Sequence, residues 1–196
     1  MNRTIKLILL SSLLIVFISG CAAIAVGSGA ATGVAIVHDR RSAGTVIDDQ
    51  GIEFKALRIL YSDDAIRNNT HINVTCYNGL LLLTGEAPTE ALRNKVVSKL
   101  SSLPKVKRTQ NEIIVAASSS YLSRSSDSLI TSKAKVSLLG LNHIQGFDPT
   151  RVKVVSENGV VYLMGLLLQH EISPVIETIR RVGGVQRVVK LFETIN

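Results

Sequence analysis

The sequence repeats itself, and this duplication limits the folds that the chain can adopt. The segment that begins at Ile72 reads INVTCYNGLLLLTGEA, and the segment that begins at Val152 reads VKVVSENGVVYLMGLL. An Asn-Gly pair and a later glycine recur at an offset of 80. An ordered series of matches is hard to obtain by chance, so we expect two copies of one small module. The matched positions are Asn78-Gly79 with Asn158-Gly159, and Gly85 with Gly165.

Each copy contains the same succession of elements. An amphipathic helix precedes a strand, an Asn-Gly turn and a second strand, and Asn and Gly tolerate the positive φ of a tight hairpin turn. A second amphipathic helix and a closing strand follow. We therefore predict an α+β fold with two tandem αββαβ units, each with a three-stranded mixed sheet packed on two helices. Further matches at an offset of 78 mark the first helices: Ile52, Lys55 and Ala56 with Ile130, Lys133 and Ala134.

The second helix of the second copy has two possible starting points because of Pro174. The repeat alignment puts Pro174 inside the helix, whereas Ser173-Pro174 also resembles an N-cap followed by a first-turn proline. We predict the later start, and we expect Gly183-Gly184 to end the helix.

Four glycines are candidate structural residues. Gly79 and Gly159 complete the predicted Asn-Gly turns, while Gly85 and Gly165 end the hairpins. We expect the latter two to meet a need for positive φ or close backbone packing, which a side chain would prevent.

The N-terminus has the layout of an export signal. Arg3 and Lys6 are followed by an apolar run from Leu7 to Ile18 and by two small residues. The segment Ile18-Ser19-Gly20-Cys21 resembles the lipobox of bacterial lipoproteins, which implies cleavage before Cys21 and acylation of its thiol. An uncleaved membrane anchor is the alternative, but it requires about 20 apolar residues, and this run is shorter.

Composition divides the rest of the chain. Ser-rich residues between the copies indicate a linker, and the Gly/Ala-rich and then polar segment before the first copy indicates a flexible tether. Cys76 lies in an apolar strand and is expected to be a small buried hydrophobe. The predicted segments are a signal peptide at 1–20, a lipidated N-terminus and tether at 21–50, a first domain at 51–117, a linker at 118–126 and a second domain at 127–196.

These features together resemble the BON-domain proteins, and among them the lipoproteins with two BON domains. The motifs that carry the resemblance are DRRSAGTVIDD from Asp39, INVTCYNG from Ile72 and ENGVVYLMG from Glu157. The resemblance implies an outer-membrane lipoprotein that faces the periplasm, supports envelope integrity and binds anionic phospholipid, notably phosphatidylglycerol, through the first helix of the second domain. Ala22, rather than Asp, follows the cysteine, which by the same resemblance favours the outer membrane.

The first helix of the second copy, expected to begin at Asp127 or Ser128, also suggests a lipid contact by itself. Its buried stripe is Ile130, Ala134 and Leu138, so other apolar residues stand among lysines on another face, where lysine stems can reach along apolar surface. An ordinary solvated face with stray apolar residues is the alternative. Related lipoproteins carry an aromatic residue where this chain has Leu129, which predicts weaker interfacial anchoring. The candidate phospholipid-binding residues are Leu129, Ser132, Lys133, Lys135, Val136 and Arg124.

We find no constellation that supports catalysis. The four histidines are scattered, and no zinc, phosphate-binding or nucleophile motif is present, so we predict no catalytic residue, metal or cofactor. The acidic pairs Asp48-Asp49 and Asp63-Asp64 are expected to be solvated loop charges. The formal net charge of +7 falls to +5 when Arg3 and Lys6 are removed with the predicted signal, and this mild surplus suits an anionic membrane surface and is too diffuse to indicate nucleic acid.

Three functions therefore remain at this point. The first is a lipid-binding factor that maintains the envelope. The second is a periplasmic chaperone or interaction module for outer-membrane protein assembly, and the third is a structural lipoprotein that contacts peptidoglycan or an assembly machine.

Overall fold

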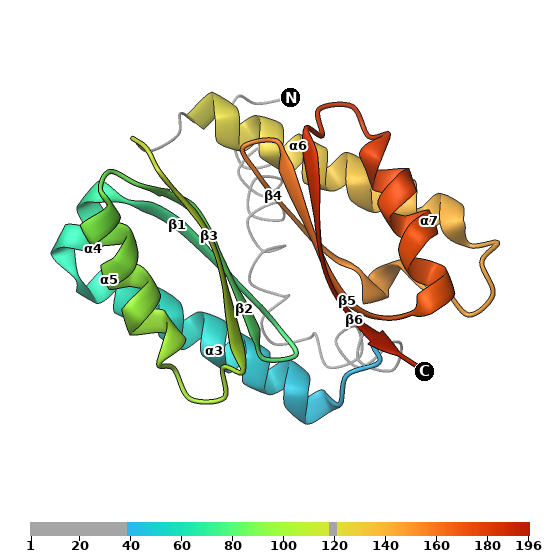
Figure 1. Cartoon of the computed structure of the whole chain (residues 1–196), viewed down its shortest axis with the longest axis horizontal. Helices are drawn as coiled ribbons and strands as arrows, with labels where there is room; N and C mark the ends of the chain where they lie inside the picture. Colours follow the sequence, from blue (N-terminus) through green and yellow to red (C-terminus); the bar gives the residue numbers. More distant parts are fainter. Residues whose placement is uncertain (1–38, 118–120) are drawn as a thin grey trace, which may run out of the picture. The chain divides into compact units, whose positions relative to one another are not determined.

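The computed structural model describes residues 39–117 and 121–196 (Figure 1). The predicted signal peptide, Cys21 and the first part of the predicted tether lie outside the described residues. Asp39–Asn196 forms a single unit by its internal contacts. None of the helices within the described ranges combines the length and the hydropathy needed to cross a bilayer.

The first copy folds as predicted, with a short additional helix. Strand β1 pairs antiparallel with β2, and β2 pairs parallel with β3, which makes a mixed sheet of order β1-β2-β3. Helix α5 is the crossover that a parallel pair requires. The elements are α3 (Ala43–Ser62), α4 (Asp64–Asn69), β1 (His71–Tyr77), β2 (Leu80–Ala87), α5 (Glu90–Ser101) and β3 (Arg108–Val115).

The second copy has the same topology. Its sheet has the order β4-β5-β6, with β4 antiparallel and β6 parallel to the central strand. The predicted α+β fold with two αββαβ units is therefore confirmed. The elements are α6 (Tyr121–Leu138), the 3-10 turns η1 (Leu139–Leu141) and η2 (Pro149–Arg151), β4 (Lys153–Glu157), β5 (Val160–Leu168), α7 (Gln169–Arg180) and β6 (Arg187–Ile195).

Both hairpins turn at their Asn-Gly pairs. The φ angles are 52° and 78° at Asn78 and Gly79, and 50° and 72° at Asn158 and Gly159. Two consecutive positive φ angles define the type I′ turn, whose twist matches that of the flanking strands.

Each unit buries one face of its sheet against its own helices. In the first unit, Leu81 and Leu83 of β2 face Ala56 and Leu100 of the two long helices. In the second, Val161 and Leu163 of β5 have the same place opposite Ala134 and Ile179. Alternate residues of a strand point to opposite faces, so the neighbouring residues of β2 and β5 point away from the helices.

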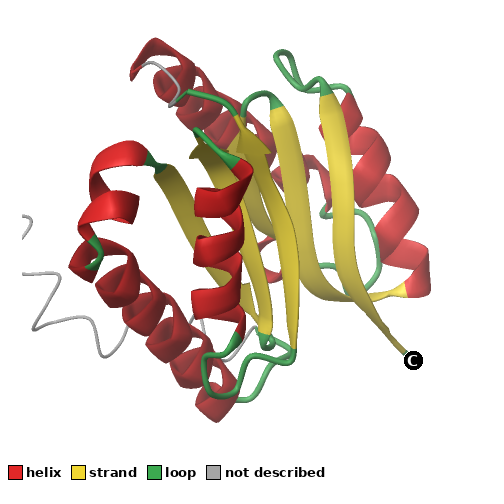
Figure 2. Cartoon of the chain, turned by 60° about the vertical axis from the view of Figure 1, so that its left-hand side comes forward, coloured by secondary structure: helices red, strands yellow, loops and turns green. Residues whose placement is uncertain are grey.

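Those neighbouring residues form a third apolar cluster, which joins the two sheets. The sheets face each other, and the helices lie outside them (Figure 2). Because both faces of β2 and β5 are covered, the central strands are almost continuously apolar. The third cluster consists of Tyr77, Leu80, Leu82, Tyr162, Met164 and Leu191.

Two helices begin earlier than predicted. Helix α3 begins at Ala43, within the predicted tether, because the Ser42 side chain caps its first turn by accepting a hydrogen bond from the Thr45 amide. Helix α6 begins at Tyr121, so residues 121–126 of the predicted linker are helical. Serine is tolerated inside this helix because hydroxyls such as that of Ser128 donate to the carbonyl one turn earlier.

The predicted late start of α7 was wrong. The helix begins at Gln169 and contains Pro174, as the repeat alignment indicated. Its first turn is held by Glu171, whose carboxylate accepts the Leu168 amide at 2.7 Å. Ile172 also packs on the core, so tertiary contacts stabilise the turn that precedes the proline.

Gly85 and Gly165 lie where the backbone of another segment of the same chain comes close. A Cβ on Gly85, where φ is +111°, would lie 1.9 Å from the His71 carbonyl oxygen. A Cβ on Gly165 would lie 2.7 Å from the Arg151 carbonyl oxygen. Both glycines therefore permit a backbone approach that no other residue allows.

Gly165→Val should destabilise the protein by about 3 kcal/mol or more, because the side chain must displace backbone. The control is Gly140→Ala, since a Cβ there meets nothing within 4 Å. Chemical denaturation measures both changes, and equal stabilities of the two variants would contradict the explanation.

Candidate functional site

Helix α6 presents an apolar surface that its own domain does not cover. Ile130, Ala134 and Leu138 are buried as predicted, whereas Leu129 and Val136 are 61% and 66% exposed. The latter two are seven residues apart and therefore lie on one face of the helix, two turns from each other.

The face is larger than the sequence analysis indicated. Leu139, the first residue of η1 directly after α6, is 60% exposed and extends the apolar surface beyond Val136. Leu139 follows Val136 by three residues, which is a helical spacing, but the sequence did not show that helical structure continues as far as Leu139. Ser132, Lys133 and Lys135 are also exposed. We call Leu129, Ser132, Lys133, Lys135, Val136 and Leu139 the α6 face.

Arg124 does not belong to the α6 face. It lies near the start of α6, is half-buried and lines a small depression together with His71, Asp127 and Glu157. At about 100° per residue, Arg124 is turned about 140° from Leu129, and it lies three turns before Lys135, which is on its side of the helix. Of the six predicted lipid-binding residues, five are exposed on the later turns of α6, and Arg124 is half-buried near its start.

The segment Asp39–Ser42, predicted as flexible tether, lies at the junction of the domains. The Arg40 guanidinium donates to both carboxylate oxygens of Glu171 in the second domain, at 2.6 and 2.8 Å. Arg40 also donates to the Leu166 carbonyl. A paired Arg-carboxylate contact of this kind fixes both distance and orientation.

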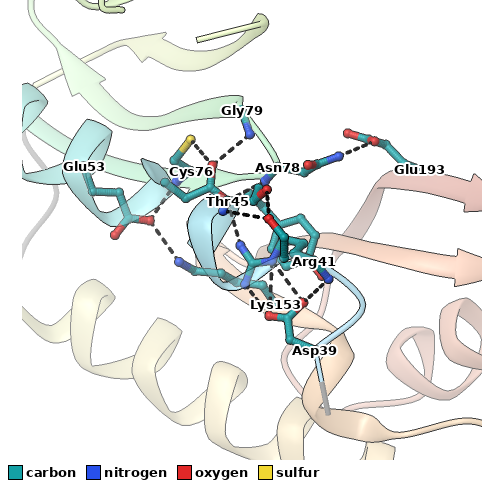
Figure 3. Close-up of polar contacts among 12 residues, drawn as sticks. Asp39, Arg41, Thr45, Glu53, Cys76, Asn78, Gly79, Lys153 and Glu193 are labelled. Atoms are coloured by element: carbon teal, nitrogen blue, oxygen red, sulfur yellow. Dashed lines mark hydrogen bonds and ion pairs between the residues drawn. The ribbon is translucent and has the colours of Figure 1, made fainter. Parts of the chain in front are cut away.

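Arg41 binds the first domain. It donates to Asp39 (Figure 3) and to Asp49 at 2.7 Å. Its guanidinium lies 3.7 Å from the centre of the Tyr77 ring. Neighbouring arginines therefore contact different domains, and we call Asp39–Ser42 the arginine clamp. The prediction of a flexible tether was wrong for these residues, because their partners are distant in the sequence.

Asp49 is a buried structural group and not the solvated charge that was predicted. Its carboxylate accepts the backbone amides of Asn78 and Gly79 at 2.6 and 2.8 Å, and the Cys76 thiol at 3.2 Å. Burial, followed by the charge of Asp49, raises the pKa of the Cys76 thiol to about 12. Cys76 is thus a buried, unreactive residue.

Asp127 has the same role in the second domain. Its carboxylate accepts the amides of Asn158 and Gly159, both at 2.9 Å. The sequence had suggested that Asp127 is the N-cap of α6, but Asp127 lies inside this helix. Asp49 and Asp127 share the offset of 78 that relates the first helices, so the repeat alignment contained the signal for this pair.

The other predicted loop acids are also engaged. Asp48 forms an ion pair with Lys105 at 2.6 Å. Asp63 caps α4 and pairs with Lys95 at 2.7 Å. A hydrogen bond from Lys95 is the main cause that lowers the pKa of Asp63 to about 2; desolvation opposes it, and a hydrogen bond from Lys99 lowers the pKa further.

One cluster of possible metal ligands occurs in the parts of the chain that the structure describes. Ligand atoms of His71, Glu86 and Glu157 lie within 4.8 Å of one another. Both carboxylates already accept amide hydrogens across the junction: Asn73 donates to Glu157 and Asn158 donates to Glu86, each at 2.6 Å. Burial raises the pKa of Glu157, although the Asn73 hydrogen bond opposes this. These groups are part of the contact between the domains.

The family model for the BON domain matches residues 48–117 and residues 126–196. The chain belongs to the BON-domain family. The first BON domain holds α3 to β3, and the second holds α6 to β6.

Two relatives match most of the chain. It is 30% identical over 178 residues to the outer membrane lipoprotein DolP of Haemophilus influenzae, in an alignment that covers 91% of this chain and 90% of DolP. It is 35% identical over 153 residues to the 21 kDa hemolysin of Actinobacillus pleuropneumoniae, which covers 78% of this chain and 77% of the hemolysin.

Among solved structures, the chain is similar to CdsD, a structural protein of the type III secretion system of Chlamydia trachomatis. The TM-score is 0.30 and the identity 13%, and the match covers 75% of this chain and 63% of CdsD. A structure of the CdsD C-terminal domain has a TM-score of 0.29.

The arginine clamp yields a test of the junction between the BON domains. Burial tends to raise the pKa of Glu171, but the hydrogen bonds from Arg40 and the Leu168 amide and the charge of Arg40 together lower it below its ordinary value of 4.5. A lowered carboxyl pKa contributes stability that is present above the unfolded-state pKa and is lost as the pH falls through the folded-state pKa. Glu171→Gln should therefore cost about 2–4 kcal/mol at pH 7, and the difference should shrink below pH 4.5.

Urea denaturation at pH 7 and pH 3 measures this difference. The matched control is Glu177→Gln, which removes an acid of the same helix whose pair with Arg180 is half-exposed. If both variants lose equal stability at pH 7, the clamp does not stabilise the junction.

Proposed function

We propose that this protein is a lipoprotein of the cell envelope, anchored through Cys21, whose α6 face contacts anionic phospholipid and thereby supports envelope integrity. The observation that carries the proposal is the α6 face itself, in which three exposed apolar side chains lie beside two exposed lysines. The relation to DolP, named as an outer membrane lipoprotein, supports an outer-membrane location, and we propose the periplasmic face of that membrane.

The chemistry of the α6 face suits the boundary between headgroups and acyl chains. Leu129, Val136 and Leu139 can enter the acyl boundary, while Lys133 and Lys135 extend their ammonium groups to phosphates. A basic residue near an anionic bilayer contributes about 1 kcal/mol, so two lysines contribute about 2 kcal/mol. Such a helix binds weakly by itself.

The lipid anchor and the α6 face would act together. Acyl chains on Cys21 would hold the protein on its membrane, since each buried methylene contributes about 0.8 kcal/mol. The weaker contact of α6 then occurs at a high local concentration. In this arrangement, α6 determines how the protein is oriented on the membrane and which lipids it prefers, while the anchor keeps the protein on the membrane.

A second function, interaction with proteins of outer-membrane assembly, is favoured by helix α3. Its outer surface exposes Phe54, Tyr61, Ile47 and Leu57 by 71%, 64%, 64% and 40%. An apolar surface of this kind is a common feature of protein contacts. This function predicts binding to outer-membrane proteins irrespective of lipid charge. No catalytic role is proposed, and the relation to DolP points to a non-enzymatic protein.

The lipid proposal predicts the effect of charge reversal on the α6 face. The double variant Lys133→Glu, Lys135→Glu should lose binding to phosphatidylglycerol vesicles, because two attractions become repulsions. Co-sedimentation of the lipid-free chain Ala22–Asn196 with phosphatidylglycerol and phosphatidylcholine vesicles measures this loss.

The control is Lys55→Glu with Arg58→Glu, which makes the same change in charge on exposed residues of α3. It should retain most of the binding, and both double variants should keep the wild-type circular dichroism spectrum. Undiminished binding of the α6 variant, or equal loss in both, would refute the assignment of the lipid contact to α6.

A further inference from the structure

A groove lies between α6 and α7 in the second BON domain, next to the α6 face. Its volume is about 580 Å³, within the range of small-molecule sites. Lys133 of α6 and Arg181, just after α7, are its two basic residues. The remaining lining combines hydroxyl groups with apolar side chains, and its main members are Ser137, Thr178, Leu141, Pro174 and Val182.

The two cations are available for a ligand. Neither Lys133 nor Arg181 forms an ion pair within residues 39–117 and 121–196, and both are exposed. Glu177 is the one acidic residue of the lining, and its carboxylate is paired with Arg180 at 2.7 Å. An anion in the groove would therefore meet two unpaired positive charges and a neutralised negative charge.

A second groove, on the other side of α6, does not offer two unpaired cations to a ligand. It measures about 420 Å³ and includes Lys135 and Leu139 together with Arg41 and Lys153. Arg41 is bound by Asp49, and Lys153 pairs with Glu53 at 2.9 Å. Two of its three cations are thus already neutralised.

Lys133 connects the α6–α7 groove to the α6 face. It is one turn from Leu129 and nearly one turn from Val136, while Ser137, one turn further along the helix, lines the groove. A phospholipid whose acyl chains contact Leu129 and Val136 would have its headgroup at the level of Lys133, and hence at the entrance of the groove.

We propose that the α6–α7 groove holds the headgroup of one phosphatidylglycerol molecule. The phosphodiester lies between Lys133 and Arg181. The glycerol hydroxyls donate to the hydroxyl oxygens of Thr178 and of Ser137, whose own hydrogen is donated to the Ala134 carbonyl. The apolar side chains of Leu141, Pro174 and Val182 cover the carbon skeleton. This inference rests on the lipid contact proposed above, and it adds Arg181, from outside α6, as a residue that determines headgroup specificity.

The test compares two adjacent arginines in the intact, acylated lipoprotein. Arg181→Gln and Arg180→Gln each remove one positive charge, and both residues are exposed, but Arg181 lines the groove and Arg180 does not. Native mass spectrometry of the protein in neutral detergent, titrated with phosphatidylglycerol, measures the dissociation constant of the first bound lipid.

We expect Arg181→Gln to weaken binding by about tenfold or more, since it removes a charge-assisted contact. Arg180→Gln should change the constant by less than about twofold, and Arg181→Lys should retain most of the affinity. Titration with phosphatidylserine, which has the same net charge, should show weaker binding to the wild type and little effect of Arg181→Gln.

Equal effects of the two glutamine variants, or no effect of either, would overturn the assignment of the groove as the headgroup site. That result would leave the α6 contact intact, because the vesicle experiment with Lys133 and Lys135 tests it separately. If both double variants still bind the vesicles fully, the lipid contact on which the groove depends is refuted instead.

Discussion

The burial of both faces of β2 and β5 determines how the rest of this protein is arranged. One face of each central strand packs on helices, and the other packs on the opposite sheet through residues such as Leu82 and Met164. An exposed sheet face rich in leucine would be an aggregation hazard, so neither domain is suited to exist with its second face in water. The two BON domains therefore form one structural unit, and the arginine clamp adds polar contacts at its edge.

This arrangement leaves the helices as the surfaces for interaction. The sheets are covered, and the acidic groups at the junction accept amide hydrogens from the facing domain. The exposed apolar residues of α3 and α6 are then the outstanding features of the surface. The two helices are related by the internal repeat but differ in chemistry: α3 displays aromatic residues, whereas α6 displays aliphatic residues beside Lys133 and Lys135. A duplicated module has thus acquired two different outer faces.

Local patterns predicted much of the fold and only part of the site. The Asn-Gly turns, the amphipathic helices and the strand glycines could be predicted because their causes lie within a few residues. Asp49 could not, because its partners Asn78 and Gly79 are in another element, and a polar neighbourhood resembles a loop. The same reason explains Arg40, whose partner Glu171 is in the other domain. Local proline chemistry favours a helix start at Pro174, whereas the repeat reflects the tertiary packing, which stabilises the turn before the proline.

The depth of α6 in a bilayer is the most direct test of the whole account. Nitroxide labels can be attached at Leu129→Cys and Val136→Cys, and at Phe54→Cys as a reference on α3, since Cys76 is buried and its pKa is raised. In the acylated protein reconstituted into phosphatidylglycerol nanodiscs, electron paramagnetic resonance should show the two α6 labels accessible to oxygen and protected from a water-soluble relaxant. The label at position 54 should show the opposite pattern. Full exposure of both α6 labels to the water-soluble relaxant would contradict the account.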